Sequence, residues 1–166
     1  MNVTVILNGN KTVLEAPADD SLMYTLRKQG CSSVKCGCGQ GSCGSCTVLF
    51  NDNPVAACKI PLGIVHNTDI VTLEYFENTE EYSIITKGFE LAGIQLCGYC
   101  NAGKIFSAYH ILKMNKIPTR DEIREQVQSL APCCTDLNTL INGIIWAIDI
   151  RDHGLERVLK KAGKTR

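Results

Sequence analysis

The sequence predicts an α+β protein with a β-rich first half and a helical second half. Apolar residues recur with a period of about two before Asn78 and of about 3.6 after it, as expected for strands and then helices. Each half also carries its own group of cysteines, out of ten in 166 residues. We therefore expect two domains, residues 1–78 and residues 79–166.

Two hairpins, a short helix and a closing strand are expected in the first half. The Asn8-Gly9 pair lies between two β-prone runs, which is a strong signal for a hairpin. Asp20 or Ser21 can cap a short helix, and Gly30 ends it. The expected strands are Val3–Leu7, Lys11–Glu15, Thr47–Phe50, Pro54–Cys58 and Asp69–Glu74.

Four helices are expected in the second half, which predicts a small helical domain. Thr119 and Glu122 have the spacing of a capping box. The last segment, Leu155–Arg166, is expected to be a frayed basic tail, with a contact to a partner subunit as the alternative. The expected helices are Tyr82–Leu91, Gly103–Asn115, Thr119–Leu130 and Asn138–Asp149.

The charge balance and the apolar pattern exclude several classes of partner. With 17 basic and 17 acidic residues, the chain has no net charge to attract nucleic acid or an anionic membrane. No apolar run reaches the roughly 18 to 20 residues that span a bilayer. The first ten residues do not resemble a secretory signal, so we expect a reducing cytoplasm, in which the thiols are available to metals.

Four cysteines of the first half, Cys38, Cys43, Cys46 and Cys58, have the spacing of a plant-type ferredoxin. A 2Fe-2S cluster takes four thiolates from a backbone that must curl closely around its sulfides. The glycines between the cysteines permit that curl, and their bare N–H groups can donate to cluster sulfur. The sequence therefore predicts a 2Fe-2S cluster here.

Zinc is the alternative metal for these thiolates. Structural zinc sites are usually built from paired C-x2-C knuckles, and the four-residue gap between Cys38 and Cys43 does not fit that pattern. Cys31 and Cys36 precede the predicted ligands and are interpreted as buried or spare thiols.

A second group of cysteines lies in the helical half. Cys97 and Cys100 precede one expected helix, and Cys133 and Cys134 precede another. Two helix N-termini could therefore direct N–H groups at one anionic cluster. By itself the C-x2-C pair is also compatible with a redox dithiol or half a zinc site, and adjacent cysteines ligate one metal only with unusual backbone geometry.

From the first hairpin to about Ile148 the chain resembles the small iron–sulfur subunit of the xanthine dehydrogenase, or molybdenum hydroxylase, family. The resemblance implies a plant-type ferredoxin-like (β-grasp) domain followed by a small four-helix-bundle 2Fe-2S domain. The segments that carry it are Cys38–Val48, Val55–Pro61, Leu96–Gly103 and Pro132–Leu137.

Two positions depart from the family pattern. Leu96 stands where the family has a glutamine that lies against the pterin of the molybdenum cofactor, and we expect Gln95 to substitute for it. Pro132 stands at a ligand position, and Cys133 stands where arginine is usual.

The resemblance makes Cys97, Cys100 and Cys134 ligands of a second 2Fe-2S cluster, with Cys133 as the expected fourth. The open alternatives are a non-cysteine ligand on one iron and a cluster that is altered or absent.

Taken as a whole, the resemblance implies an electron-transfer subunit with no substrate chemistry of its own. Two 2Fe-2S clusters would relay electrons from a molybdopterin-binding large subunit to an FAD-binding medium subunit. The alternatives are a single-cluster ferredoxin-like subunit whose second site is altered, and a zinc-stabilised interaction module. Three scattered histidines without Ser or Asp partners at motif spacing support no acid–base catalysis.

Overall fold

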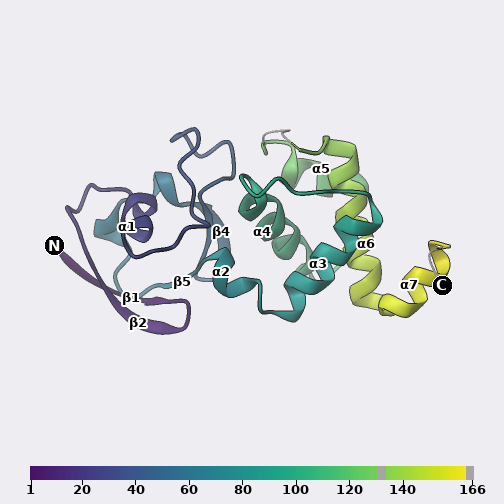
Figure 1. Ribbon diagram of the computed structural model, residues 1–166, viewed down its shortest axis with the longest axis horizontal. Coiled ribbons are helices and arrows are strands. Elements are labelled where there is room, and N and C mark those ends of the chain that lie inside the picture. Colours follow the sequence, from purple (N-terminus) through teal and green to yellow (C-terminus); the bar gives the residue numbers. More distant parts are fainter. Residues whose placement is uncertain (131–133, 164–166) are drawn as a thin grey trace.

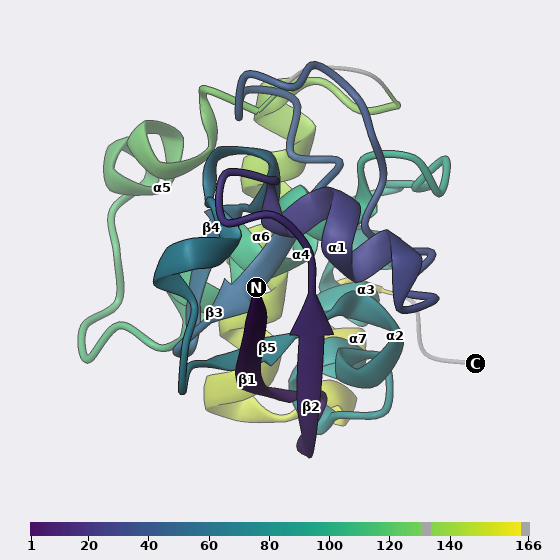
Figure 2. The same ribbon diagram turned by 90° about the vertical axis from the view of Figure 1, so that its left-hand side faces the viewer.

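The protein consists of two lobes that lie side by side, with the two termini at opposite ends of the long axis (Figure 1). The computed structural model describes residues 1–130 and 134–163. The first lobe is built on a β-sheet and the second is helical, so the expected α+β class is confirmed. Figure 2 looks onto the sheet lobe, with the helical lobe behind it.

A five-stranded mixed sheet forms the first lobe, with the strand order β2-β1-β5-β3-β4. The central β5 pairs in parallel with β1 and antiparallel with β3, and both outer pairs are hairpins. The strands are β1 Asn2–Leu7, β2 Asn10–Glu15, β3 Thr47–Phe50, β4 Asn53–Ala56 and β5 Asp69–Val71.

Both hairpin turns have the backbone that their sequences require. Asn8 and Gly9 have φ values of 52° and 79°, and Asn51 and Asp52 have 46° and 65°. Positive φ at both central residues matches the right-handed twist of the flanking strands, and Asn, Asp and Gly tolerate it best. The two expected hairpins are therefore confirmed.

Two of the expected strands are shorter than predicted. The chain leaves β4 at Ala56 and enters a 3₁₀ turn, η1 (Ala57–Lys59), so Cys58 lies in a turn and not in a strand. The closing strand ends at Val71, because the chain turns at Thr72 into the short helix α2 (Leu73–Phe76). Leu73 and Phe76 are thereby buried, which alternation along a strand would not achieve for both.

Helix α1 (Leu22–Lys28) forms where the sequence predicts a short helix. The Ser21 side chain caps it by accepting a hydrogen bond from the backbone N–H of Tyr24, and Gly30 follows its end with φ of 89°. The lobe's core combines the inward face of the sheet with this helix. Its fully buried members include Val3, Val5, Leu14, Leu22, Met23, Leu26, Val48, Leu62 and Ile70.

The second lobe contains the four expected helices and one more. Thr119 and Glu122 form the predicted capping box at the start of α5. The segment expected to be a frayed tail instead forms α7, which buries Val158 against the lobe and orders the chain to Ala162. The bounds are α3 Glu80–Leu91, α4 Asn101–Leu112, α5 Arg120–Val127, α6 Leu137–His153 and α7 Leu155–Lys161.

The two lobes share an apolar junction. Leu49 of β3 and the α2 residues Leu73 and Phe76 belong to the core of the helical lobe. The Phe76 ring packs edge-on against Phe106 and Tyr109 of α4, at centroid distances of 5.2 Å and 4.9 Å. The domain boundary expected at residue 78 stays a prediction.

A polar contact reinforces the junction at its rim. The Tyr109 hydroxyl donates to Asp52 Oδ1 at 2.9 Å, and Lys113 forms an ion pair with the same carboxylate. Tyr109 lies on α4, Lys113 is the C-cap residue of that helix, and Asp52 lies in the turn between β3 and β4. This contact fixes the end of α4 to the hairpin that precedes Cys58.

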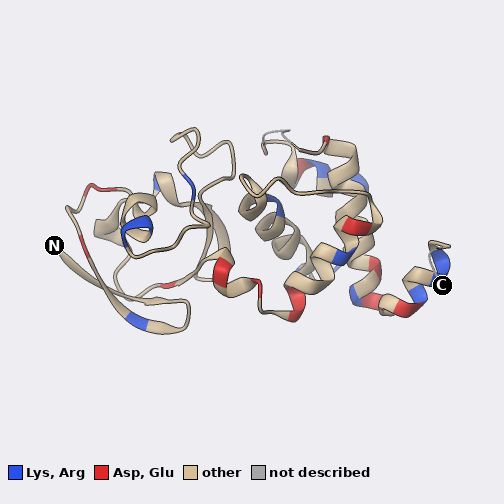
Figure 3. Ribbon diagram, in the orientation of Figure 1, with Lys and Arg blue, Asp and Glu red and all other residues tan. Residues whose placement is uncertain are grey.

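Both lobes carry basic and acidic residues (Figure 3). This distribution agrees with the balanced composition. In the described ranges, no helix is long and apolar enough to cross a membrane.

Helices α3 and α6 approach at a point where only glycine fits. A Cβ atom on Gly88 would lie 2.5 Å from the backbone N of Ala147 and 2.6 Å from the carbonyl O of Gly143. Backbone atoms of a packed helix cannot move aside as a flexible side chain can. The approach therefore depends on Gly88.

We predict that Gly88→Ala lowers the free energy of unfolding of the helical lobe by about 1–2 kcal/mol, since overpacking costs about 1–3 kcal/mol and alanine regains up to about 1 kcal/mol of helix propensity. Urea unfolding followed by far-UV circular dichroism measures it. Ser83→Ala, at an exposed position of the same helix, is the control and should change stability little. A Gly88→Ala protein as stable as the parent would contradict the packing described.

Candidate metal centres

The long loop after α1 carries three of the expected ligands, Cys38, Cys43 and Cys46, and the turn after the β3–β4 hairpin carries the fourth, Cys58. The backbone N–H of Ala57 donates to the carbonyl of Cys46 at 3.1 Å, which anchors turn η1 beside the loop. Burial raises the pKa of the Cys46 thiol to about 11, and the thiols of Cys58 and Cys43 beside it add to this rise. The structure thus places Cys58 beside Cys46, and the full set of four ligands stays a prediction.

Backbone N–H groups of the loop converge on Cys38. Its Sγ accepts from the N–H groups of Gln40 and Ser42 at 3.3 Å and of Cys43 at 3.4 Å. The Ser42 side chain and these N–H groups lower the pKa of the Cys38 thiol to about 5. The loop therefore stabilises sulfur in its anionic form, as a metal ligand requires.

Glycine makes this backbone conformation possible. Gly39, Gly41 and Gly44 have φ values of 67°, 80° and 76°, in the left-handed region. A Cβ atom on Gly37 would lie 2.6 Å from Cys43 Sγ, so the backbone there can approach the cysteines only without a side chain. The glycines are thus a geometric requirement of the loop.

Ser45 provides an independent sign that the loop fits a cluster. Its Oγ is buried, with the residue 1% exposed, and it is the one buried side-chain N or O atom of the described residues that lacks a hydrogen-bond partner. A Cβ atom on Gly37 would lie 3.1 Å from this Oγ, which places Ser45 close to Cys43. An unsatisfied buried hydroxyl is costly, and cluster sulfur would supply an acceptor.

Three cysteines of the second group come together in the helical lobe. The Sγ atoms of Cys97, Cys100 and Cys134 lie within 4.8 Å of one another. Cys100 is buried at the N-cap of α4, and Cys134 lies two residues before Asp136, the N-cap of α6. Two helix N-termini therefore converge on this site. Cys133, the expected fourth ligand, lies outside the described residues.

Gln95 and Leu96 lie just before this second centre. Gln95 is exposed, and Leu96 is half-buried against the core of the helical lobe. Leu96 therefore has a packing role, while the amide of Gln95 is accessible from outside. The expected contact of Gln95 with a pterin stays a prediction.

Sequence reasoning missed Lys104, which reaches the second centre from α4. Its Nζ lies 2.8 Å from Cys100 Sγ, although the residue is only 2% exposed. Residues four apart lie on the same face of a helix, so the spacing from Cys100 to Lys104 is the signal that could have found it.

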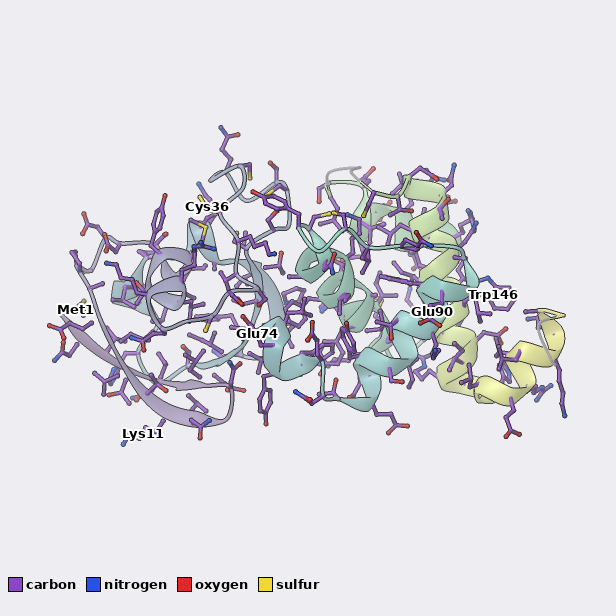
Figure 4. The ribbon with its side chains drawn as sticks, viewed as in Figure 1. Met1, Lys11, Cys36, Glu74, Glu90 and Trp146 are labelled. Carbon is purple, nitrogen blue, oxygen red and sulfur yellow. The ribbon has the colours of Figure 1, made fainter. Side chains whose placement is uncertain are left out.

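The two centres are in direct contact through their backbones. A Cβ atom on Gly103, in the first turn of α4, would lie 2.7 Å from the Cα of Gly44, which lies between Cys43 and Cys46. The Tyr99 hydroxyl also donates to the carbonyl of Cys36 at 2.7 Å. Figure 4 shows Cys36 on the side of the sheet lobe from which the cysteine loop projects.

Hydrogen bonds between Glu74 and Ser33 also hold the start of the cysteine loop to α2. The carboxylate of Glu74 accepts from the backbone N–H of Ser33 at 2.6 Å and also binds the Ser33 hydroxyl. Burial alone would raise the pKa of Glu74, but the Ser33 hydrogen bonds outweigh it and hold the pKa below its usual value. Glu74 lies near the junction of the lobes in Figure 4.

A ferredoxin-type sheet lobe and a helical lobe, each with its own cysteine centre, define a two-centre iron–sulfur protein. Two protein-family models match the chain. The model described as 2Fe-2S iron-sulfur cluster binding domain matches residues 5–62, and the model described as [2Fe-2S] binding domain matches residues 72–145. The chain therefore carries two 2Fe-2S clusters, one in each lobe.

Related proteins place the chain among oxidoreductase subunits. It is 32% identical over 150 residues to the nicotinate dehydrogenase small FeS subunit of Eubacterium barkeri, covering 90% of this chain and 96% of that one. It is 31% identical to rat (Rattus norvegicus) xanthine dehydrogenase/oxidase over 82% of this chain and 11% of that much larger protein.

A solved structure gives the same result. A chain of quinoline 2-oxidoreductase from Pseudomonas putida 86 superimposes with a TM-score of 0.79 at 30% identity, covering 93% of this chain and 98% of that one. This protein therefore belongs to the iron–sulfur subunits of the xanthine dehydrogenase, or molybdenum hydroxylase, family. In such an oxidoreductase it performs no substrate chemistry itself. The expected family, fold class and cofactors are confirmed.

We predict that Ser45→Ala lowers the reduction potential of the first cluster. A neutral hydrogen bond contributes about 0.5–1.5 kcal/mol, so the ratio of reduced to oxidised cluster at a fixed potential should fall by about two- to tenfold. EPR-monitored redox titration measures it. Ser32→Ala, at an exposed position of the same segment, is the control. Equal potentials in Ser45→Ala and the parent would show that the hydroxyl does not donate to the cluster.

Proposed function

We propose that this chain relays electrons from a molybdopterin site on a large partner subunit to FAD on a second partner subunit. In this proposal the helical lobe would hold the cluster that accepts each electron, and the sheet lobe would hold the cluster that donates it onward. Each cluster, when bound, supplies one-electron redox chemistry between ferric and ferrous iron. The protein positions the two centres, buries them and directs hydrogen bonds at their sulfurs.

The contact between Gly44 and Gly103 is the observation that carries the proposal. Gly44 lies within the first cysteine loop, and Gly103 follows Cys100 in α4. Because neither residue has a side chain, the backbones of the two centres approach more closely than any other pair of residues would allow. A short path between two redox centres is what a relay needs.

The proposed ligands of the first cluster are Cys38, Cys43, Cys46 and Cys58. Their support is the convergence of N–H groups on Cys38, the position of Cys58 beside Cys46, and the unsatisfied hydroxyl of Ser45. Four thiolates are the donor set of a 2Fe-2S cluster.

The proposed ligands of the second cluster are Cys97, Cys100, Cys134 and Cys133. The first three have Sγ atoms within 4.8 Å of one another, which supports their share of the set. The role of Cys133 rests on its place in the sequence, next to Cys134 and after Pro132.

Each centre has an exposed cysteine, so a partner subunit can approach it there. Cys38 and Cys97 are exposed, whereas Cys46 and Cys100 are buried behind them. The loop after α1 and the loop before α4 lie on the same side of the molecule (Figure 1). We propose that the Gln95 side faces the molybdopterin subunit and the Cys38 loop faces the FAD subunit. The cytoplasmic location expected from reduced thiols stays a prediction.

Iron and acid-labile sulfide analysis of anaerobically purified protein tests the metal content, together with EPR after dithionite reduction. Two clusters require about four irons and four sulfides per chain and two distinct signals. About two irons and one signal would instead support the single-cluster alternative, in which Pro132 marks a changed second site. Colourless protein with zinc and no iron would support the zinc alternative.

The direction of the relay is tested in the assembled oxidoreductase. Freeze-quench EPR after mixing with the enzyme's substrate should show the second cluster's signal before the first cluster's. If the two EPR signals appeared together, or the first cluster's signal appeared before the second cluster's, the proposed direction would be contradicted.

We predict that Gly103→Ala slows electron transfer between the clusters. The new Cβ would meet Gly44 Cα and carbonyl O at 2.7 Å and 2.9 Å, so the loops must separate, at a cost in stability of about 1–3 kcal/mol. The same freeze-quench series measures the delay between the two signals. Ser107→Ala, one turn further along α4, is the control. An unchanged delay in Gly103→Ala would show that the contact is not part of the path.

A further inference from the structure

We propose that Lys104 raises the reduction potential of the cluster in the helical lobe, which makes that cluster the preferred acceptor of the incoming electron. The inference rests on the proposed function, because it takes Cys97, Cys100 and Cys134 to hold the second cluster. Lys104 lies outside the proposed ligand set and acts on the cluster through a ligand.

The position of Lys104 is fixed by helix geometry. It follows Cys100 by four residues, so both lie on one face of α4 and its first turn. Its Nζ is 2.8 Å from Cys100 Sγ, within hydrogen-bonding distance of a thiolate. The donor is a cation, and such hydrogen bonds are roughly twice as strong as neutral ones.

The surroundings of the Lys104 side chain are mostly apolar. A cavity of about 140 Å³ beside it is lined by Val127, Leu130, Leu137 and Leu140, with the uncharged polar residues Gln128 and Thr135. In the described part of the chain, no carboxylate lies within ion-pair distance of Lys104. Because Lys104 is only 2% exposed, bulk water does not solvate its ammonium group in place of a counter-ion.

A buried charge is costly unless an opposite charge compensates it. Here the three cysteines of the second centre are the negative groups within reach, and Cys100 is the one in contact. The lysine is thus explained by the centre beside it. The packing of α4 alone would be served better by an apolar side chain of similar length.

The fixed cation has a defined effect on redox equilibrium. A 2Fe-2S cluster held by Cys97, Cys100 and Cys134 would supply one-electron chemistry between ferric and ferrous iron, and its reduction would make the net charge of the centre more negative by one. The ammonium group of Lys104 attracts the reduced form more strongly than the oxidised form, and this attraction is large in an interior of low polarity. Lys104 therefore shifts the equilibrium toward reduction.

Redox titration of the full chain with both clusters, followed by the two EPR signals, tests this inference. In Lys104→Met the ratio of reduced to oxidised second cluster, at a fixed potential, should fall at least tenfold, which is a shift of about 59 mV for one electron. The first cluster of the same molecule is the internal reference and should not shift. Lys104→Arg keeps the cation and should retain most of the parent potential.

Two further variants keep the test decisive. Lys104→Gln retains a polar side chain without the charge, and it serves if the methionine variant loads no second cluster. Lys87→Met removes an exposed lysine of α3 that pairs with Glu90, and it controls for the loss of a surface charge. The glutamine variant should shift the potential in the same direction as the methionine variant, and Lys87→Met should not shift it.

The outcomes separate this inference from the proposed function. Two signals in the parent, with the second potential unchanged in Lys104→Met and Lys104→Gln, would overturn the inference and leave the relay intact. A single signal in the parent would overturn both. A lowered potential in Lys104→Met that Lys104→Arg restores would establish the role of the charge.

Discussion

The close approach of two glycines is the constraint on which the rest of the structure depends. Gly44 and Gly103 let the two cysteine centres meet backbone to backbone, and the surrounding contacts hold them there. Tyr99 bonds to Cys36 beside this contact, while Phe76 and Asp52 fix α4 against the sheet lobe from below. The two lobes are therefore parts of one electron-transfer unit.

Much of the fold could be predicted, because its local signals agree with its tertiary packing. Asn-Gly and Asn-Asp turns, the Ser21 cap and the Thr119 capping box each act over a few residues, and each occurs as expected. The ends of β4 and β5 were predicted wrongly for the opposite reason. The chain turns at Ala57 and at Thr72, which places Cys58 beside the cysteine loop and Phe76 in the junction between the lobes. These turns depend on contacts with residues far along the chain, which local sequence patterns do not show.

The terminal helix α7 was missed because its sequence is dominated by charge. Only Val158 of this segment is buried, so the apolar period that reveals a helix is almost absent. Glu156 in its first turn and Lys160 and Lys161 in its last turn suit the helix dipole and act without a core.

The cysteines of the candidate site could be proposed from the sequence, whereas the burial of the neighbouring groups Ser45 and Lys104 could not. Spacing places thiolates, since a cluster dictates how far apart its ligands stand along the chain. Spacing does not show that Ser45 is buried without a partner. The interval of four residues places Lys104 on the same helix face as Cys100, but it does not show that the side chain of Lys104 is buried. Those facts depend on how α4 packs against α5 and the cysteine loop, and they appear only in three dimensions.

The proposed ligands of the first centre come from two parts of the fold. Cys38, Cys43 and Cys46 follow one another in a single loop, whereas Cys58 comes from a turn after the β3–β4 hairpin. That hairpin is held in the sheet through β5, which pairs with β1 at the start of the chain. The position of Cys58 beside the loop therefore depends on the folded sheet, including the strand at the start of the chain.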